Sequence, residues 1–280
     1  MIVAVAEYLY RDYKTSIDRR FELFQNTESV QVLFNGNSHT GCLGTPYING
    51  KKSFNFSVGG QDIFHIYTVL KTALQNNNQI EKVIVGIDYD LFGYDYEIAN
   101  TMWLDRNYYK STGILYDSTF ANRLMAQSGF FQANRDFGYL KKKFSSKDNA
   151  NKATEKPNFV PIKGHAEDRA KEHSFQKYDI NLIEMNKDYL EKLIQLVKSK
   201  GMEITLVNLP KKEAYYNFYN DNAKNKGKEI LNELSTKHNI LFIDFWRDSS
   251  FVDKDFLDGD HLTPEGAEKV LRRIEDKIKT

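Results

Sequence analysis

Strand-like runs alternate along this chain with stretches of helical periodicity, and this alternation constrains the fold more than any other feature. Five apolar runs rich in β-branched or aromatic residues predict strands: Val30–Phe34, Ser53–Val58, Lys82–Ile87, Glu203–Leu209 and Ile240–Phe245. Four helices are predicted from periodic apolar patterns: one begins near Asp62, a second ends at Gly201, a third covers residues 229–237, and the fourth follows Thr263-Pro264. This order is typical of a parallel sheet with helices on both faces. We therefore predict a flavodoxin-like three-layer α/β/α sandwich.

Residues 95–180 interrupt the alternation and predict an insertion after the third strand, within a single domain spanning residues 1–280. The first half of the insertion is aromatic, and the second half, from Lys141 to about Gln176, is polar and rich in lysine. The second half predicts a mobile loop. The aromatic residues predict either a small core of the insertion or a groove where sugar rings stack, and both can hold together. They are Tyr94, Tyr96, Trp103, Tyr108, Tyr109, Tyr116, Phe120, Phe130, Phe131, Phe137 and Tyr139.

Composition excludes several classes of function. The 39 Lys and Arg residues against 38 Asp and Glu leave a formal charge of +1, which gives no ground for a nucleic-acid partner. The single cysteine, Cys42, excludes an internal disulfide, and only its closeness to Ser38 favours a thiol nucleophile. No run reaches the ~18 apolar residues of a membrane span. Because the chain has no glycine-rich nucleotide motif and no histidines at metal-ligand spacing, we expect no cofactor and no metal.

Two short motifs near opposite ends of the chain carry the chemistry. The first, Gly36-Asn37-Ser38-His39, follows the first predicted strand, so Ser38 lies where a buried strand breaks into a tight turn. The second runs from Asp258 through His261 to Pro264. A serine hydroxyl becomes a nucleophile when a base takes its proton and a third group orients that base. His261 is the candidate base, and Asp258, three residues earlier, is close enough to hold it.

Each of these residues also has a structural interpretation. Ser38 could cap the helix that follows it, because serine is favoured at helix N-termini. His261 could be a polar loop histidine. Asp258 competes with Asp260 for the third role of the triad. The predicted motif residues all fall just after strands. Ligands of open α/β sheets bind outside the carboxyl ends of the strands, so the catalytic interpretation is favoured.

Gly-x-Ser near the N-terminus with Asp-x-x-His near the C-terminus resembles the SGNH (GDSL-like) hydrolase superfamily. The form Gly-Asn-Ser-His is similar to its extracytoplasmic bacterial branch, which includes polysaccharide O-acetyltransferases. The resemblance covers roughly residues 28–95 and 180–280, and the Asp-x-x-His-Leu-Thr-Pro-x-Gly block is its specific part. The family pattern selects Asp258 for the triad and leaves Asp260 as a turn or capping residue.

The oxyanion hole is expected from backbone N–H groups aimed at the developing charge. One candidate is the N–H of Ser38. The other is the Gly59-Gly60 turn, which matches the second block of the family, with Gly60 marginally preferred over Gly59. Asn37 is expected to brace the loop through side-chain bonds to the backbone, and His39 either contacts substrate or caps the turn.

The chain departs from the family at its third block, which is usually Gly-x-Asn-Asp with the asparagine as an oxyanion donor. Here the chain reads Gly86-Ile87-Asp88-Tyr89. An ionised Asp88 would repel an oxyanion, so the asparagine role does not transfer. Asp88 could be protonated, bind a tyrosine or the loop backbone, or point away, and Tyr89 could donate in its place.

The resemblance implies serine-dependent O-acyl transfer, with acetyl the favoured group, to a bacterial cell-surface polysaccharide. It also implies an acyl donor supplied by a membrane acyltransferase and a location in the cell envelope, with a membrane anchor in the full-length protein. Two alternatives stay open. One is a carbohydrate esterase with the same triad, and the other is a non-catalytic glycan-binding protein, which the aspartate at position 88 motivates.

Overall fold

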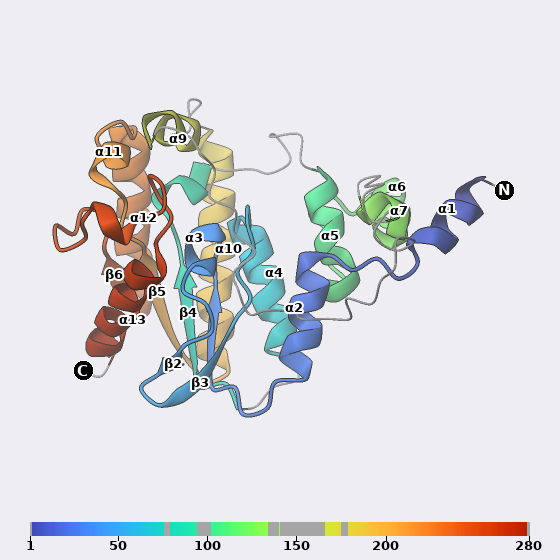
Figure 1. Ribbon diagram of the computed structural model, residues 1–280, viewed down its shortest axis with the longest axis horizontal. Helices are drawn as coiled ribbons and strands as arrows, with labels where there is room; N and C mark the ends of the chain where they lie inside the picture. The colour runs from blue at the N-terminus through green and yellow to red at the C-terminus, as the bar shows by residue number, and fades with distance from the viewer. Residues whose placement is uncertain are drawn as a thin grey trace. The chain divides into compact units, whose positions relative to one another are not determined.

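The computed structural model describes residues 2–75, 79–93, 102–133, 140, 166–174 and 179–278 (Figure 1). Its contacts divide the chain into two compact units, each built from two segments. Unit 1 comprises Met1–Thr27 and Tyr96–Glu155, and unit 2 comprises Glu28–Asp95 and Lys156–Thr280. Most of the expected insertion therefore belongs to unit 1, together with the N-terminal segment. Its inclusion in one folding domain with the rest of the chain stays a prediction.

Unit 2 is built on a six-stranded sheet. The strands lie in the order β2-β3-β1-β4-β5-β6, and only β2 is antiparallel to its neighbour. Without β2 the chain order across the sheet is 2-1-3-4-5, which is the flavodoxin-like order, so the predicted fold class is confirmed. The strands are β1 (Val32–Asn35), β2 (Tyr47–Ile48), β3 (Lys51–Asn55), β4 (Lys82–Gly86), β5 (Glu203–Asn208) and β6 (Leu241–Asp244).

Helices cover both faces of this sheet, because successive residues of its strands are buried on both sides. Side chains of α13 (Pro264–Ile278) pack on one face, where Phe34, Ile84 and Ile243 belong to the same core cluster. The opposite face is covered by α4 (Ile63–Ala73) and α10 (Ile180–Ser199), which pack on each other (Figure 1). The helix α12 (Asp221–His238) packs against β6 and α10.

The helix termini follow the local signals of the sequence. Asp62 caps α4 by accepting from the backbone N–H of His65. Thr263 precedes Pro264 and accepts from the backbone N–H of Gly266, which satisfies one of the N–H groups left open at the start of α13. Gly201 follows α10 with φ +72°, the left-handed conformation that glycine adopts without strain.

Unit 1 is helical. Its α5 contacts α2, α6 and α7, and α1 contacts α7. Tyr10 of α1 meets Phe130 edge-on with ring centroids 5.4 Å apart, and Tyr108 is buried, so the packing of these aromatic residues includes the N-terminal segment and is not the insertion's alone. Phe120 is 78% exposed and lies outside that core. The helices are α1 (Ile2–Tyr10), α2 (Ser16–Gln25), α5 (Met102–Thr112), α6 (Phe120–Gln127) and α7 (Gly129–Gln132).

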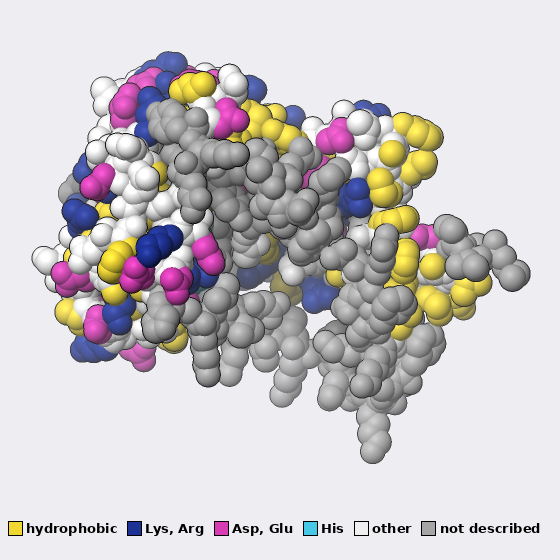
Figure 2. All heavy atoms as spheres, turned by 90° about the horizontal axis from the view of Figure 1, so that it is seen from above, with side chains coloured by type: hydrophobic (Ala, Val, Ile, Leu, Met, Phe, Trp, Pro, Cys, Tyr) yellow, Lys and Arg dark blue, Asp and Glu magenta, His cyan; other side chains and the backbone are white. Residues whose placement is uncertain are grey.

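Two helices of unit 1 each carry two exposed large apolar side chains. They are Val5 and Tyr8 on α1, and Phe120 and Leu124 on α6, and hydrophobic side chains are visible at the surface of this part of the chain in Figure 2. In the described parts of the chain, no helix is both long and apolar enough to cross a membrane. Tyr94, Tyr96, Phe137, Tyr139 and the side chain of Trp103 lie outside the described residues.

The expected loop between Lys141 and Gln176 is wrong for one stretch, because residues Ala166–His173 form the helix α9. This helix belongs to unit 2 and contacts the short helix α11 (Glu213–Tyr216). The sequence did not predict this helix because it is polar, and its buried positions include Arg169, which forms an ion pair, as well as Ala170. Residues 141–165 and 175–176 lie outside the described residues.

Candidate active site

The segment after β1 sets the place of Ser38. Asn35 accepts from the backbone N–H of Gly36 and donates to the carbonyl of Ile66, which fixes the exit of the strand. Asn37 is the N-cap of the short helix α3 (Ser38–Gly41) and accepts from the backbone N–H of His39. The bracing expected for Asn37 is therefore present. The capping interpretation of Ser38 is wrong, because Ser38 is already the first residue of the helix.

A close approach of backbones holds α3 against the sheet. Thr40 lies between Gly36 and Gly86, and a Cβ built on either glycine would overlap the Thr40 side chain. The site therefore needs glycine at the ends of both β1 and β4, for space and not for a special backbone angle.

Replacing Gly86 with alanine should lower the free energy of unfolding by about 1–3 kcal/mol, the usual cost of overpacking. Thr40→Ala removes the overlapping hydroxyl, so the double variant should lose less stability than the sum of the two single variants. Urea titrations of the four proteins measure this coupling. Gly41→Ala is the control, because its nearest neighbour would lie 3.9 Å away. Equal losses for Gly41→Ala and Gly86→Ala would contradict the packing argument.

The structure brings Ser38, His261 and Asp258 together. Ser38 Oγ lies 3.0 Å from His261 Nε2, and His261 Nδ1 lies 2.9 Å from Asp258 Oδ2. Asp258 Oδ1 also accepts from the backbone N–H groups of Asp260 and His261, which locks the carboxylate within its own turn. His261 is 1% exposed, whereas Ser38 is only partly buried. A hydroxyl open to solvent thus faces a buried imidazole with a carboxylate behind it.

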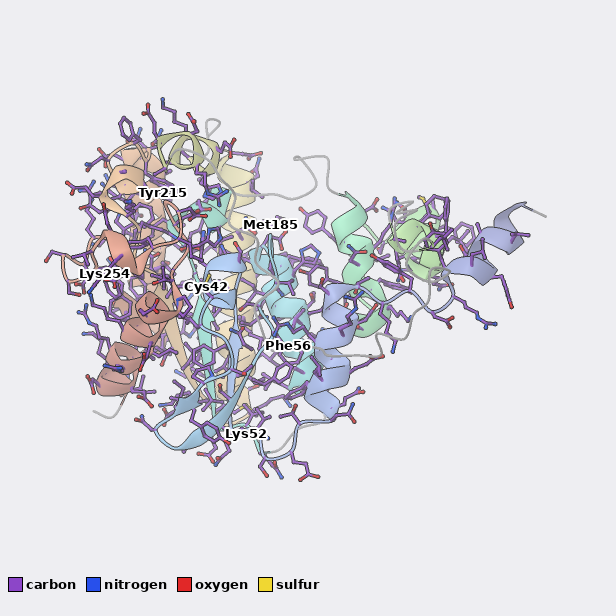
Figure 3. All side chains as sticks on the ribbon, in the orientation of Figure 1. Cys42, Lys52, Phe56, Met185, Tyr215 and Lys254 are labelled. Carbon is purple, nitrogen blue, oxygen red and sulfur yellow. The ribbon has the colours of Figure 1, made fainter. Side chains whose placement is uncertain are left out.

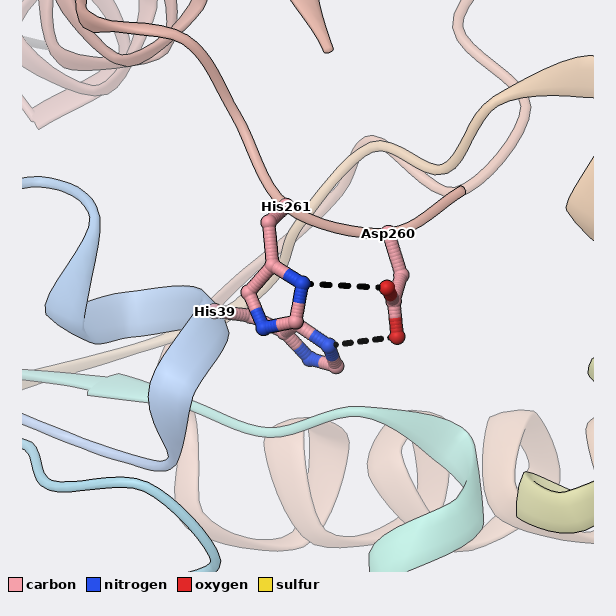
Figure 4. Close-up of side chains that lie close together, drawn as sticks. All are labelled: His39, Asp260 and His261. Carbon is pink, nitrogen blue, oxygen red and sulfur yellow. Dashed lines mark hydrogen bonds and ion pairs between the residues drawn. The ribbon is translucent and has the colours of Figure 1, made fainter. Parts of the chain in front are cut away.

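Asp260 is not merely the turn residue that was expected. Its carboxylate is buried and faces two histidines, with Oδ1 3.1 Å from His261 Nδ1 and Oδ2 2.9 Å from His39 Nε2 (Figure 4). Arg169 of α9 binds the same carboxylate through Nε and Nη2, both at 2.9 Å. A carboxylate buried this deeply requires such partners, and the sequence motif alone does not reveal them.

The ring of His39 is buried and binds two carboxylates, so it does not cap the turn, and its contact with substrate stays a prediction. Its Nδ1 lies 2.6 Å from Asp88 Oδ2. Lys211 Nζ lies 2.8 Å from Asp88 Oδ1, and Asn37 Nδ2 donates to Asp88 Oδ2. Asp88 is therefore neither protonated nor pointing away, and its charge is bound by a lysine and a histidine.

The charges of this cluster shift several pKa values. Burial and Lys211 oppose the charge of His39, but Asp88 and Asp260 outweigh them and raise its pKa to about 9. Burial opposes the charge of Asp88, but Lys211 and His39 hold its pKa well below the usual range. Asp90 is different, since burial and the neighbouring Asp88 raise its pKa to about 7.

Three residues of this cluster were not predicted as site residues: Lys211, Arg169 and His173. Lys211 follows β5 as Asp88 follows β4, so its position at the carboxyl edge of the sheet was the signal available. His173 Nδ1 lies 2.9 Å from the hydroxyl of Tyr215, and burial lowers the pKa of His173 to about 3. Arg169 and His173 had no such signal, because both lie on the unexpected helix α9.

The candidate oxyanion loop follows β3. Asn55 donates to the carbonyls of Thr40 and Gly44 and accepts from the backbone N–H of Ser57, so it ties this loop to α3. Gly60 has φ +75°, and Gly59 is exposed with open space around its Cα. Both remain candidates for the second donor.

Two further residues expected near the site are engaged elsewhere. The hydroxyl of Tyr89 donates to Asp244 Oδ2 at 2.5 Å, so it does not serve as the substitute donor. The Cys42 thiol, beside α3 in Figure 3, donates to the carbonyl of Ser38, and burial raises its pKa to about 11. A thiol with a raised pKa is a poor nucleophile at neutral pH.

A metal does not fit the histidine cluster. Ligand atoms of His39, Asp260 and His261 lie within 4.8 Å of one another. However, Asp260 already binds the Arg169 guanidinium, His39 lies between Asp88 and Asp260, and His261 is bonded to Ser38 and Asp258. A cation added there would face these positive charges and would break existing bonds.

Comparisons with known proteins agree with this architecture. The structure of a Streptococcus pneumonia protein, provisionally described as a platelet activating factor, matches with a TM-score of 0.50 and 14% identity, over 93% of this chain and 92% of that one. A protein from Slackia heliotrinireducens, provisionally described as an SGNH hydrolase, matches with a TM-score of 0.47 and 10% identity, over 90% and 100% of the two chains. The match to the Streptococcus pneumonia protein shows that the two chains share a fold. A variant acetylxylan esterase from Geobacillus stearothermophilus also matches, with a TM-score of 0.46 and 12% identity, over 90% and 94%.

Sequence comparisons add little to this structural match. One protein-family model matches residues 162–280, which is less than half of the chain. The curated proteins contain no match. At position 88, where the SGNH pattern that the sequence resembles has an asparagine, this chain has an aspartate whose charge is bound by Lys211 and His39.

Proposed function

We propose that this protein cleaves an O-acyl ester through an acyl-enzyme formed on Ser38. The observation that carries the proposal is the hydrogen-bonded series from Ser38 Oγ through His261 to Asp258, with the serine partly open to solvent. A base at 3.0 Å from the hydroxyl is within the range that proton transfer requires.

The first step uses His261 as the base. Ser38 Oγ attacks the carbonyl carbon of the ester while its proton passes to His261 Nε2, and Asp258 stabilises the resulting imidazolium. The bond from the carbonyl carbon to the leaving oxygen then breaks, and His261 gives that oxygen the proton. An acyl group remains on Ser38. In the second step a hydroxyl gives its proton to His261 and attacks the acyl carbon. The bond from that carbon to Ser38 Oγ then breaks, and His261 returns the proton to Ser38 Oγ.

Backbone N–H groups are the proposed donors to the oxyanion. The N–H of Ser38 is at the first position of α3, where a helix provides no intrahelical partner. The N–H of Gly60 or Gly59 is proposed as the second donor. Each donor of this kind contributes about 10²–10³-fold to kcat.

The acceptor of the second step is proposed to be a polysaccharide hydroxyl, with acetyl as the acyl group. This proposal extends the resemblance of the Gly-Asn-Ser-His motif, and with it come a membrane acyltransferase as donor and a location in the cell envelope. Water in place of the sugar would make the protein a carbohydrate esterase. Both versions use the same three residues, so the acceptor decides between them.

Intact-mass spectrometry after exposure to p-nitrophenyl acetate tests the acyl-enzyme. We expect one acetyl adduct on the wild type and on Cys42→Ser, located on Ser38 by peptide mapping, and none on Ser38→Ala. Cys42→Ser is the matched control because its thiol is the neighbouring nucleophile. An adduct that survives in Ser38→Ala at wild-type yield would refute the proposal. Added oligosaccharide distinguishes the acceptors, since transfer gives an acetylated sugar and hydrolysis gives free acetate.

A further inference from the structure

A second histidine lies directly against the candidate base. The rings of His39 and His261 have centroids 4.7 Å apart with planes tilted by 54°. The two rings also share one carboxylate, because Asp260 bonds His261 through Oδ1 and His39 through Oδ2 (Figure 4). The proposed triad needs neither His39 nor Asp260, so their close association with its base calls for an explanation.

Charged groups face His39 from several elements. Asp88 follows β4 and Asp260 belongs to the histidine loop, and these carboxylates contact opposite nitrogens of the ring. Lys211, after β5, lies 2.9 Å from Nδ1, and His173 of α9 lies with its ring centroid 6.2 Å away. Asp90 is also buried within the electrostatic reach of His39. The carboxylates at the two nitrogens favour an imidazolium, whereas Lys211 at Nδ1 opposes it, and the balance raises the pKa of His39 to about 9.

His261 faces a different set of charges. Two carboxylates, Asp258 and Asp260, both lie within 3.1 Å of Nδ1, while Nε2 faces Ser38. Two negative charges beside one imidazole favour its protonated form. A protonated His261 has no lone pair for the Ser38 proton, so a base in this setting needs a nearby positive charge as an offset. His39 supplies one at the distance of a ring contact.

We propose that His39 and Asp260 are positioning residues for His261: Asp260 fixes the ring from a second side, and the charge of His39 keeps it unprotonated. Arg169 takes part by binding both oxygens of Asp260, which holds that carboxylate between the two rings. The role rests on the proposed function, in which His261 is the base. The electrostatic coupling between the two histidines, however, is measurable without any activity.

NMR titration of ¹⁵N-histidine-labelled protein tests the coupling directly. In His39→Gln the ring signals of His261 should titrate at higher pH than in the wild type, because the offsetting charge is gone. The acid limb of kcat/KM for p-nitrophenyl acetate should move up by the same amount. A merely structural role for His39 would lower activity at every pH without moving the limb.

His238→Gln is the matched control, since His238 also bonds a carboxylate, Glu191 at 2.8 Å, away from this cluster. It should leave the titration of His261 unchanged. An unchanged pKa of His261 in folded His39→Gln would overturn the inference. If that variant does not fold, the wild-type spectrum decides, because His39 must carry protons on both nitrogens at pH 8, and a neutral His39 would overturn the inference.

These readouts separate the two proposals. Absence of an acyl-enzyme together with a shifted His261 would refute the proposed function and support the coupling. An acyl-enzyme together with an unshifted His261 would support the function and refute the coupling.

Discussion

Replacing Asp258 with asparagine should lower kcat by about 10⁴-fold, the loss typical of a triad aspartate changed to its amide. The amide can present a donor to His261 Nδ1, which favours the tautomer with its proton on Nε2. That tautomer cannot accept the Ser38 proton. Asp258 also contacts His261 from a turn that its own bonds to the backbone N–H groups of Asp260 and His261 hold in place.

The loss in kcat for Asp258→Asn is to be compared with that for Asp260→Asn. Asp260 also lies near His261 Nδ1, but Arg169 and His39 share its charge. We expect a smaller loss in kcat, about 10–100-fold, which is typical of a residue that only orients a catalytic side chain, here the imidazole of His261. Initial rates with p-nitrophenyl acetate, at a temperature where circular dichroism shows both variants folded, measure the difference. A larger loss for Asp260→Asn would exchange the two assignments.

Replacing Lys211 with methionine should lower the free energy of unfolding by about 3–5 kcal/mol, the cost of breaking a buried ion pair from one side. The Lys211 side chain is 0% exposed and that of Asp88 only 3%, so water cannot replace the lost partner. His39 remains, but it already shares its charge with Asp260. Urea denaturation followed by tryptophan fluorescence measures the loss.

Acidity gives a second readout of the same pair. The pKa of Asp88 is depressed in the folded protein, so its stabilisation is present above about pH 4 and lost as the pH falls further. Lys211→Met should lose less stability on acidification than the wild type. Without Lys211 the pKa of Asp88 is lowered less, so its protonation costs less stability. Lys212→Met is the control, since its ion pair with Asp253 is exposed and should contribute at most about 1 kcal/mol. Equal losses for the two lysine variants would contradict the prediction.

Most of the fold of unit 2 could be predicted from the sequence because its signals are local. The β-branched runs, the Asp62 and Thr263 caps, and the glycine after α10 each report on a few neighbouring residues. The short strand β2 and the helix α9 were missed because their sequences carry no such local signal. The helix α9 has few apolar residues, and it packs on α11 and binds Asp260 through Arg169, partners that lie far away in the sequence.

The candidate site divides in the same way. Ser38, Asp258 and His261 were found because each lies in a motif whose spacing is short and chemically meaningful. The partners of Asp88, His39 and Asp260 were not found, because they lie far apart along the chain, among them Lys211 after β5 and Arg169 of α9. The two aspartates that flank Gly259 gave a partial signal, since a pair of carboxylates before a histidine needs a compensating positive charge.

The distance along the chain between the two halves of the triad also bears on synthesis. Ser38 and His261 are 223 residues apart, so at about 5–20 residues per second the serine precedes its base by about 10–45 s. During that interval Ser38 is an ordinary alcohol without a proton acceptor. If Ser38 is the nucleophile that we propose, a nascent chain cannot form the acyl-enzyme until His261 has been made, after the last strand β6 (Leu241–Asp244).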